Sequence, residues 1–260
     1  NKTIYFIANW KMNGNHNSIK EIERVFICFK KNAIYKFKKI IFCPPVNLLG
    51  SFSEKIKSRL IDFGTQDISK INISNGPYTG QLSAKMLKET GANYVIIGHS
   101  EKRIIDEDFK TIKEKVNVAL KNKLKVIFCI GENLSQKNNG ISLKVLKKQI
   151  LSSLDKKKIN FDNLIIAYEP IWSIGSGNVP TILEIKEISD AIIATINELK
   201  SQNKIANNAN VSVLYGGSVN SKNSASILAI DNIDGLLIGK ASLEADEFVE
   251  IALSYQSSAK

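Results

Sequence analysis

The sequence predicts an α/β protein with a single-domain (β/α)8 barrel. Three observations favour this fold class: eight short runs rich in β-branched residues, longer amphipathic segments between them, and no linker or change of composition along the 260 residues. Repeated strand–helix units form a parallel sheet, and about eight of them in roughly 250 residues are typical of a closed barrel. On pattern alone, a doubly wound open sheet is the alternative. We expect one domain over residues 1–260.

The predicted strands are short and almost continuously apolar. In chain order they cover 3–10, 39–43, 60–66, 93–98, 124–131, 164–168, 211–216 and 233–239. Strands with this composition are buried on both faces, as they are in a parallel sheet that helices cover.

The segments between the strands have the period of amphipathic helices. In chain order the predicted helices cover 18–32, 47–58, 83–90, 108–122, 141–155, 181–203, 221–229 and 242–255. The clearest apolar stripes run through Ile19, Ile22, Val25, Phe26 and Phe29, and through Phe109, Ile112, Val116 and Leu120. Ser18 and Thr181 are predicted N-caps, and Glu184 gives the second of them a capping box.

The composition is that of an ordinary globular protein, with a high net charge of +11. No apolar stretch approaches the roughly 20 residues that cross a bilayer, and no signal peptide is visible. The charge comes almost entirely from lysines scattered over the predicted helices. Because arginine is scarce and no basic run is interleaved with aromatic residues, a solvated surface is favoured over nucleic-acid binding. We expect no membrane and no nucleic-acid partner, and a positive field that attracts small anions.

The cysteines Cys28, Cys43 and Cys129 are odd in number, widely spaced and without a CxxC pair. This spacing argues against a disulfide framework or a zinc site and fits a reducing, cytoplasmic location. Cys129 follows an apolar approach, so we expect a small buried residue beside the site rather than a nucleophile.

Polar side chains stand at the ends of three predicted strands. Asn9 and Lys11 end the first, His99 follows the fourth and Glu169 follows the sixth. In a (β/α)8 barrel these ends meet at one mouth, where active sites lie. Taken singly, the three charged or titratable residues have simpler readings as a surface lysine, a core histidine and a solvent-facing carboxylate. Together they suit proton transfer beside a carbonyl group of an anionic substrate.

Glycine-rich turns follow the last three predicted strands, at 175–177, 216–218 and 239–240. Glycine allows several backbone N–H groups to point at one anion, and the phosphate site of such barrels is typically built after strands seven and eight. We therefore expect a phosphorylated substrate. The stretch PIWSIGSG, 170–177, predicts a lid with a stiff hinge and a glycine tip that excludes water.

Six stretches then carry a family resemblance. They are ANWKMN (8–13), GHSEKR (98–103), CIGE (129–132), AYEPIWSIGSG (167–177), YGGSV (215–219) and DGLLIGKASL (234–243). With these motifs in this order, the chain resembles the triosephosphate isomerase family over essentially its whole length. The resemblance implies a TIM barrel that interconverts dihydroxyacetone phosphate and D-glyceraldehyde 3-phosphate through an enediolate, in glycolysis and gluconeogenesis.

The resemblance also implies a role for each candidate residue. Glu169 would move the proton, His99 would polarise the carbonyl as a neutral imidazole, and Lys11 would supply positive charge. The other implied residues are Asn9 for substrate oxygens, backbone N–H groups of Gly175, Ser218, Gly239 and Lys240 for the phosphate, and Glu101 and Cys129 in support. No metal and no organic cofactor is implied, because the substrate's own carbonyl acidifies the proton.

A homodimer is implied as well, in which the loop 72–82, with Thr79, inserts beside the partner's site. Several positions depart from the family's pattern: Lys240 for a common second glycine, Lys102 for Arg, Gln81 for Glu, Asp67 for Asn, and a turn at 104–107 that is one residue short. Positions 102 and 81 often carry an ion pair across the family's interface. We therefore expect a dimer that is less locked by charge.

Two other classes of protein stand as alternatives. Another phosphate-binding barrel enzyme, such as a phosphoribosyl isomerase or an indole-forming synthase, would share the last glycine loops but not NWK, GHSE and EPIW together. A catalytically inactive barrel that serves as a scaffold, an adhesin or an RNA-binding module would lack an acid–base group. Lys11, His99 and Glu169 are all present.

Overall fold

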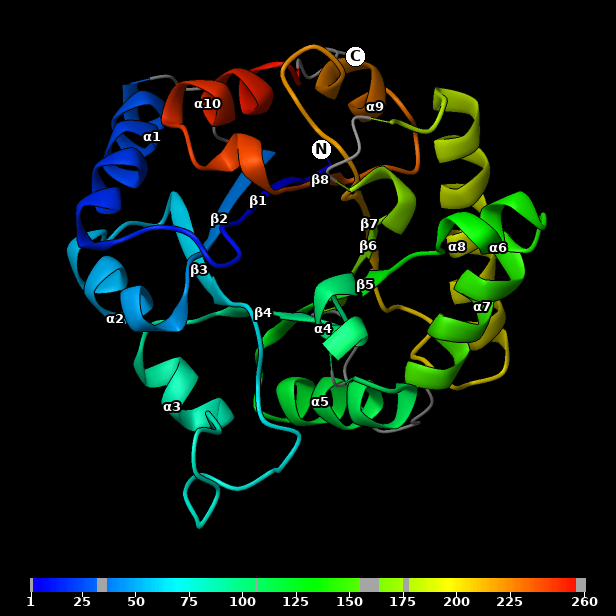
Figure 1. Ribbon diagram of the computed structural model, residues 1–260, viewed down its shortest axis with the longest axis horizontal. Coiled ribbons are helices and arrows are strands. Elements are labelled where there is room, and N and C mark those ends of the chain that lie inside the picture. Colours follow the sequence, from blue (N-terminus) through cyan, green and yellow to red (C-terminus); the bar gives the residue numbers. More distant parts are fainter. Residues whose placement is uncertain (1, 32–36, 106, 155–163, 175–177, 256–260) are drawn as a thin grey trace.

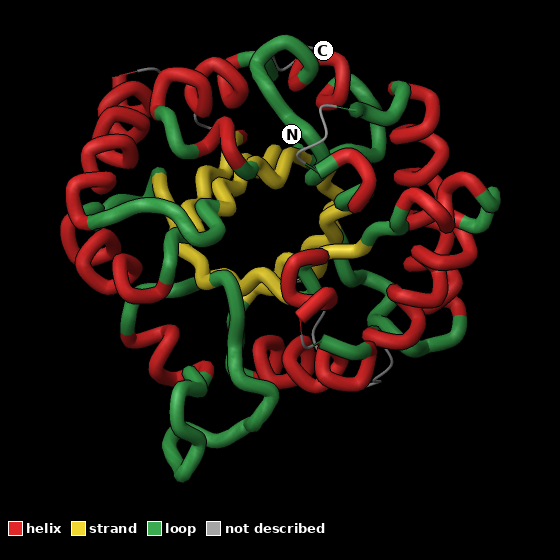
Figure 2. The backbone as a smooth tube through the Cα atoms, in the orientation of Figure 1, coloured by secondary structure: helices red, strands yellow, loops and turns green. Residues whose placement is uncertain are grey.

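The computed structural model describes residues 2–31, 37–105, 107–154, 164–174 and 178–255. In this part of the chain eight parallel strands close into a barrel in sequence order, and β8 pairs with β1. The strands are β1 (Ile4–Asn9), β2 (Lys38–Cys43), β3 (Ile61–Thr65), β4 (Tyr94–Ile97), β5 (Lys125–Ile130), β6 (Leu164–Tyr168), β7 (Ser212–Tyr215) and β8 (Gly235–Ile238). Figure 2 shows this ring of strands inside a ring of helices. The predicted (β/α)8 barrel is confirmed, and the open sheet is excluded.

The longer helices lie around the outside of the barrel, whereas α4 is drawn over the ends of β4 and β5 (Figure 1). They are α1 (Ile19–Lys31), α2 (Val46–Lys55), α3 (Ala84–Glu89), α4 (Ser100–Ile105), α5 (Phe109–Lys121), α6 (Leu134–Asn138), α7 (Ser142–Ser153), α8 (Ile182–Ser201), α9 (Ser224–Leu228) and α10 (Ala245–Leu253), with the 3-10 helices η1 (His16–Ser18), η4 (Ile171–Ser173) and η5 (Lys240–Ser242). The sequence did not predict α4 and α6, which are six and five residues long and come directly before the longer helices α5 and α7. None of the described helices combines the length and the apolar character needed to cross a membrane.

Helix starts follow the predicted caps with one correction. The hydroxyl of Thr181 accepts the N–H of Glu184 at 3.2 Å, and the Glu184 carboxylate accepts the N–H of Thr181 at 2.7 Å. Ser18, however, is not an N-cap. Asn15 caps η1, the turn before α1, and the Ser18 hydroxyl accepts the N–H of Asn15 at 3.0 Å to complete that capping box. The apolar period begins only at Ile19, which is why the sequence placed the cap too late.

Alternate strand residues fill two separate apolar cores. In β5, Ile127 and Cys129 point into the barrel, whereas Val126 and Phe128 pack against the surrounding helices. This double burial explains the continuous apolar runs of the strands. Phe109 departs from its predicted stripe: it is the first residue of α5 and is 38% exposed.

Candidate active site

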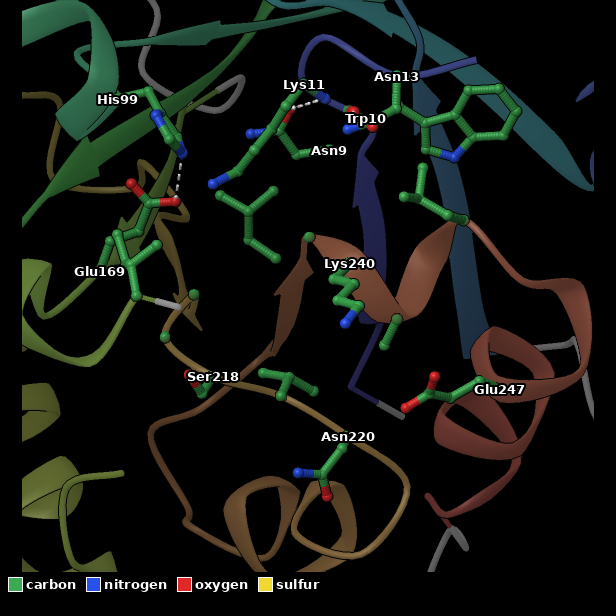
Figure 3. A pocket seen from close by; sticks show the side chains of 18 residues that line it. Asn9, Trp10, Lys11, Asn13, His99, Glu169, Ser218, Asn220, Lys240 and Glu247 are labelled. Carbon is green, nitrogen blue, oxygen red and sulfur yellow. Dashed lines mark hydrogen bonds and ion pairs between the residues drawn. The ribbon is translucent and has the colours of Figure 1, made fainter. Parts of the chain in front are cut away.

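A pocket of about 710 Å3 lies at the mouth of the barrel, among the segments that follow β1, β4, β6, β7 and β8. Figure 3 shows the side chains that converge on it. The pocket brings together these residues singled out from the sequence: Asn9, Lys11, His99, Glu169, Ser218, Gly239 and Lys240. Gly175 lies outside the described residues.

His99 and Glu169 face each other in this pocket. The Nε2 atom of His99 lies 3.2 Å from the Oε1 atom of Glu169, and the two side chains are only 6% and 4% exposed. The other carboxylate oxygen, Oε2, is buried and has no hydrogen-bond partner among the described residues. A buried polar atom without a partner is rare in proteins, and its place beside an imidazole in a pocket suits a base that meets a substrate.

The start of α4 fixes the ring of His99. Gly98, at the end of β4, has φ of 73°, a left-handed conformation that lets the chain turn from the strand into the helix. The backbone N–H of Glu101 then donates to Nδ1 of His99 at 3.2 Å. Because Nδ1 accepts this bond, the proton of the neutral ring is on Nε2, the atom that faces Glu169.

The charge state of His99 depends on its contact with Glu169. Burial lowers the pKa of His99, while the negative charge of Glu169 and the hydrogen bond to it raise that pKa, and the balance is a raised value. A substrate oxygen that replaces the carboxylate at Nε2 would remove the main cause of the raised pKa. The bond from Glu101 to Nδ1 would then favour the neutral ring.

Lys11 is held in a strained backbone conformation. Its φ of 54° is in the left-handed region, which residues other than glycine seldom adopt. Asn9 Oδ1 accepts the N–H of Lys11 at 3.1 Å, and the Gln66 amide donates to the carbonyl oxygen of Lys11 at 2.8 Å. The ammonium group lies 2.7 Å from Glu101 Oε1. Gln66 is not among the site residues predicted from the sequence, although it too is a polar residue at the end of an apolar run.

The first residues of the predicted lid form hydrogen bonds with two neighbouring segments. The indole N–H of Trp172 donates to Glu132 Oε1 at 2.8 Å, and the hydroxyl of Ser218 donates to the carbonyl oxygen of Ser173 at 2.7 Å. These bonds anchor η4 to the segment after β5 and to the loop after β7. The predicted glycine tip, 175–177, lies outside the described residues.

Gly216 makes room for the Glu169 side chain. A Cβ atom at position 216 would lie 2.8 Å from the Cγ atom of Glu169, closer than carbon atoms approach. A glycine directly after β7 is therefore needed for this position of the carboxylate, in addition to any role in a turn.

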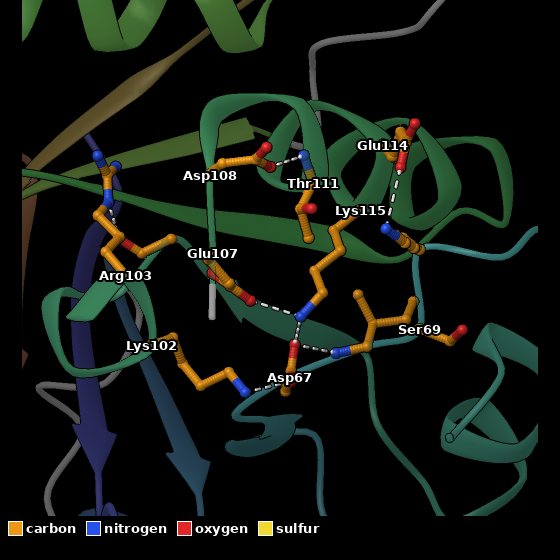
Figure 4. Close-up of polar contacts among 12 residues, drawn as sticks. Asp67, Ser69, Lys102, Arg103, Glu107, Asp108, Thr111, Glu114 and Lys115 are labelled. Atoms are coloured by element: carbon orange, nitrogen blue, oxygen red, sulfur yellow. Dashed lines mark hydrogen bonds and ion pairs between the residues drawn. The ribbon is translucent and has the colours of Figure 1, made fainter. Parts of the chain in front are cut away.

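Two of the departures from the family's pattern contact each other. Lys102 Nζ lies 3.1 Å from Asp67 Oδ2, and Asp67 Oδ1 lies 2.5 Å from Lys115 Nζ. Lys115 also forms an ion pair with Glu107, and both of these side chains are buried (Figure 4). The network joins α4 and α5 to the segment after β3. Lys102 thus has an acidic partner in its own chain, and the expected weakening of the dimer interface stays a prediction.

Neither the thiols nor the acidic groups form a metal site here. Within the described ranges no group of three or more His, Cys, Asp or Glu side chains is placed to hold a metal ion. Cys129 is 1% exposed, and burial together with the charge of Glu169 raises its pKa well above the usual range. A thiol in this state is a poor nucleophile. Cys43 and Cys129 are buried free thiols.

The fold and the pocket define the class of protein: a (β/α)8-barrel enzyme whose site joins a carboxylate, an imidazole and an ammonium group. The family model described as triosephosphate isomerase matches residues 4–255. The chain belongs to the triosephosphate isomerase family, the aldose–ketose isomerases of triose phosphates. This assignment sets aside the other phosphate-binding barrel enzymes.

Individual relatives agree with the family assignment. The triosephosphate isomerase of Lawsonia intracellularis is 37% identical over 95% of this chain and 96% of its own length. That of Rhodococcus jostii is 38% identical over 94% of each chain. The crystal structure of the Bartonella henselae triosephosphate isomerase matches with a TM-score of 0.84 and 33% identity, over 97% of this chain and 98% of that one.

Proposed function

We propose that this pocket interconverts dihydroxyacetone phosphate and D-glyceraldehyde 3-phosphate, with Glu169 as the base, His99 as the acid and Lys11 as the electrostatic stabiliser. The observation that carries these roles is the contact of 3.2 Å between Glu169 Oε1 and His99 Nε2, beside a second carboxylate oxygen that lacks a partner in the described chain.

The reaction moves a proton between two neighbouring carbon atoms. The carboxylate of Glu169 takes the proton from the carbon beside the carbonyl group, while the Nε2–H of His99 donates to the carbonyl oxygen. The ammonium group of Lys11 stabilises the negative charge of the resulting enediolate. A positive charge that is already positioned before the reaction contributes most to lowering the barrier. Glu169 then returns the proton to the other carbon. The proton of the neighbouring hydroxyl group passes through Nε2 of His99 to the former carbonyl oxygen, so that the carbonyl and hydroxyl groups exchange places. All electrons stay within the substrate, so the reaction needs no cofactor.

The rest of the pocket would bind the substrate. We place its phosphate group against the backbone N–H groups of Ser218, Gly239 and Lys240, together with Gly175, which lies outside the described residues. Asn9 would contact the substrate oxygens. Glu101 would orient Lys11, from which it is 2.7 Å away.

A homodimer is part of the proposal. The loop 72–82, with Thr79, projects from the barrel between β3 and α3 (Figure 1). Large apolar side chains are exposed on the connections that follow β1, β3 and β4: Met12 at 96%, Ile73 at 44%, Tyr78 at 45%, Ile104 at 77% and Ile105 at 76%. Apolar groups gathered on one side of a molecule favour an interface. An active monomer at micromolar concentration in analytical ultracentrifugation would contradict the dimer.

The free thiols fit the cytoplasm as the proposed location.

The direct test is a coupled NADH assay of D-glyceraldehyde 3-phosphate conversion by the wild-type chain and by Glu169→Gln. General-base catalysis typically contributes 10²–10⁴-fold, so we expect kcat to fall by about 10³-fold in the variant. Glu187→Gln on the exposed face of α8 is the matched control for the loss of one carboxylate. A folded wild-type chain without activity would overturn the reaction, and a variant within about tenfold of wild type would overturn the role of Glu169.

A further inference from the structure

The side chain of Lys240 enters the pocket at the end away from His99 and Glu169. Lys240 is the first residue of η5, directly after β8 and Gly239. Figure 3 shows its side chain extending into the pocket on the side where Ser218, Asn220 and Glu247 lie. Ser218 and the backbone of 239–240 belong to the proposed phosphate end, so the ammonium group and these N–H groups share one part of the pocket.

The positive charge of Lys240 is not offset at close range. Within the part of the chain that the structure describes, its ammonium group has no hydrogen bond and no ion pair within 4.0 Å, not even with the carboxylate of Glu247 in the same pocket. The other lysine of the pocket differs, since Lys11 Nζ lies 2.7 Å from Glu101 Oε1. Lys240 therefore offers a cation that is available to a ligand.

We infer that the ammonium group of Lys240 binds the phosphate group of the substrate and is a specificity-determining contact of this chain. The inference rests on the proposed function, because that function places the phosphate here. A phosphate dianion accepts several hydrogen bonds, and a lysine ammonium adds a mobile point charge with three donors. The backbone N–H and the side chain of one residue then bind the same anion.

This contact makes recognition of the phosphate sensitive to salt. The backbone N–H groups carry no net charge, whereas the attraction between an exposed ammonium group and a dianion is screened as ionic strength rises. The contact lies far from the carbon atoms that exchange the proton. It therefore contributes to substrate binding and leaves the chemical step to Glu169, His99 and Lys11.

The variants that test this inference are Lys240→Gln, which removes the charge but keeps a long polar side chain, and Lys240→Arg, which restores the charge. Lys121→Gln, on the exposed end of α5, removes one charge outside the pocket. Calorimetry with inorganic phosphate at low and high sodium chloride gives the affinity for the anion without turnover. Steady-state kinetics with D-glyceraldehyde 3-phosphate and with unphosphorylated D-glyceraldehyde separate phosphate binding from chemistry.

For Lys240→Gln we expect the phosphate Kd and the KM for D-glyceraldehyde 3-phosphate to rise about fivefold, between the effects of an exposed ion pair and a charge-assisted hydrogen bond. This rise should disappear at high salt, should be absent in Lys240→Arg, and should be absent when D-glyceraldehyde is the substrate. The kcat value should change by less than about twofold, as expected when an interaction that binds substrate and transition state equally is lost. An unchanged phosphate Kd, or an equal change in Lys121→Gln, would overturn the inference.

Failure of the inference and failure of the proposed function are distinguishable. If the wild-type chain bound inorganic phosphate through Lys240 but did not convert the triose phosphate, the proposed function would fail and the phosphate contact would stand. If it turned over normally and Lys240→Gln bound phosphate as wild type does, only the contact would fail.

Discussion

The Nε2 atom of His99 and the Oε1 atom of Glu169 lie 3.2 Å apart, although they come from the ends of β4 and β6 and are 70 residues apart in the sequence. The closed barrel brings these strand ends to one mouth, with β5 between them. The contact makes the charge of His99 depend on Glu169, and it gives the first prediction.

The raised pKa of His99 should depend on the carboxylate of Glu169. A folded-state pKa above 6.5 means that the folded protein binds the proton more tightly than the unfolded chain does. The pair therefore adds to the free energy of unfolding below pH 6.5, and this contribution is lost as pH rises through the raised pKa. Burial is already the largest single effect on this pKa, and in Glu169→Gln it is no longer outweighed by the carboxylate, so the pKa of His99 should fall below 6.5.

NMR titration of the imidazole signals measures this shift, since the chain has only 2 histidines. His16→Gln assigns the signals. Equal pKa values of His99 in the wild-type chain and in Glu169→Gln would show that the carboxylate does not control the ring.

Gly216→Ala should impair catalysis by displacing Glu169, the proposed base. The new Cβ would lie 2.8 Å from Cγ of Glu169, so the carboxylate must move. A displacement of this order costs about 10²-fold in kcat. Gly50→Ala is the matched control, because a Cβ at this position of α2 meets nothing within 4 Å. It should keep kcat and gain up to about 1 kcal/mol of helix stability. Wild-type kcat in Gly216→Ala would show that the carboxylate position is not restricted there.

Glu132→Ala should loosen the start of the lid. Glu132 Oε1 accepts hydrogen bonds from Trp172 Nε1 at 2.8 Å and from the Tyr168 hydroxyl at 3.1 Å. Burial and the charge of Glu132 raise the pKa of Tyr168, so its hydroxyl remains a donor. Removing the acceptor abolishes both of these hydrogen bonds, at a cost of about 2 kcal/mol.

Urea unfolding and the fluorescence of Trp172 report the two consequences for the lid. Glu132→Gln keeps a carbonyl oxygen for the indole and should retain most of the stability. If Glu132→Ala and Glu132→Gln were equally stable, these hydrogen bonds would not hold the segment.

Lys115→Met should destabilise the fold through the charge that it leaves behind. The side chains of Glu107 and Lys115 are 1% and 8% exposed, so the variant leaves a carboxylate buried without its cation. Such a loss costs about 3–5 kcal/mol. The double variant Lys115→Met/Glu107→Leu should recover most of it, because no buried charge remains. Denaturant unfolding of the three chains tests this, and a double variant no more stable than Lys115→Met would contradict it.

The sequence predicted the strands closely, because strands buried on both faces must be apolar throughout. It also predicted that Asn9, Lys11, His99 and Glu169 share the mouth, since strand ends meet there in any parallel barrel. It could not predict which of these groups touch. The bond from Gln66 to Lys11 depends on the pairing of β1 with β2 and of β2 with β3, which no local pattern contains.

Lys102 shows the same limit. Comparison with the family's pattern predicts only that Lys102 and Gln81 weaken the contact with a partner subunit. In the folded chain its ammonium group lies 3.1 Å from Asp67, another position that departs from the pattern. The two substitutions form a pair only after β3 and β4 have brought their following segments together.

The left-handed backbone of Lys11 has a consequence for evolution of the chain. A side chain at φ of 54° costs about 1–2 kcal/mol relative to a relaxed conformation, and glycine would avoid that cost. Replacing Lys11 by glycine would therefore relieve the strain and remove the positive charge of the site in a single step. Selection for thermal resistance alone would favour this change, and selection for turnover would oppose it. Position 11 is thus a place where engineering for robustness and engineering for speed conflict within one residue.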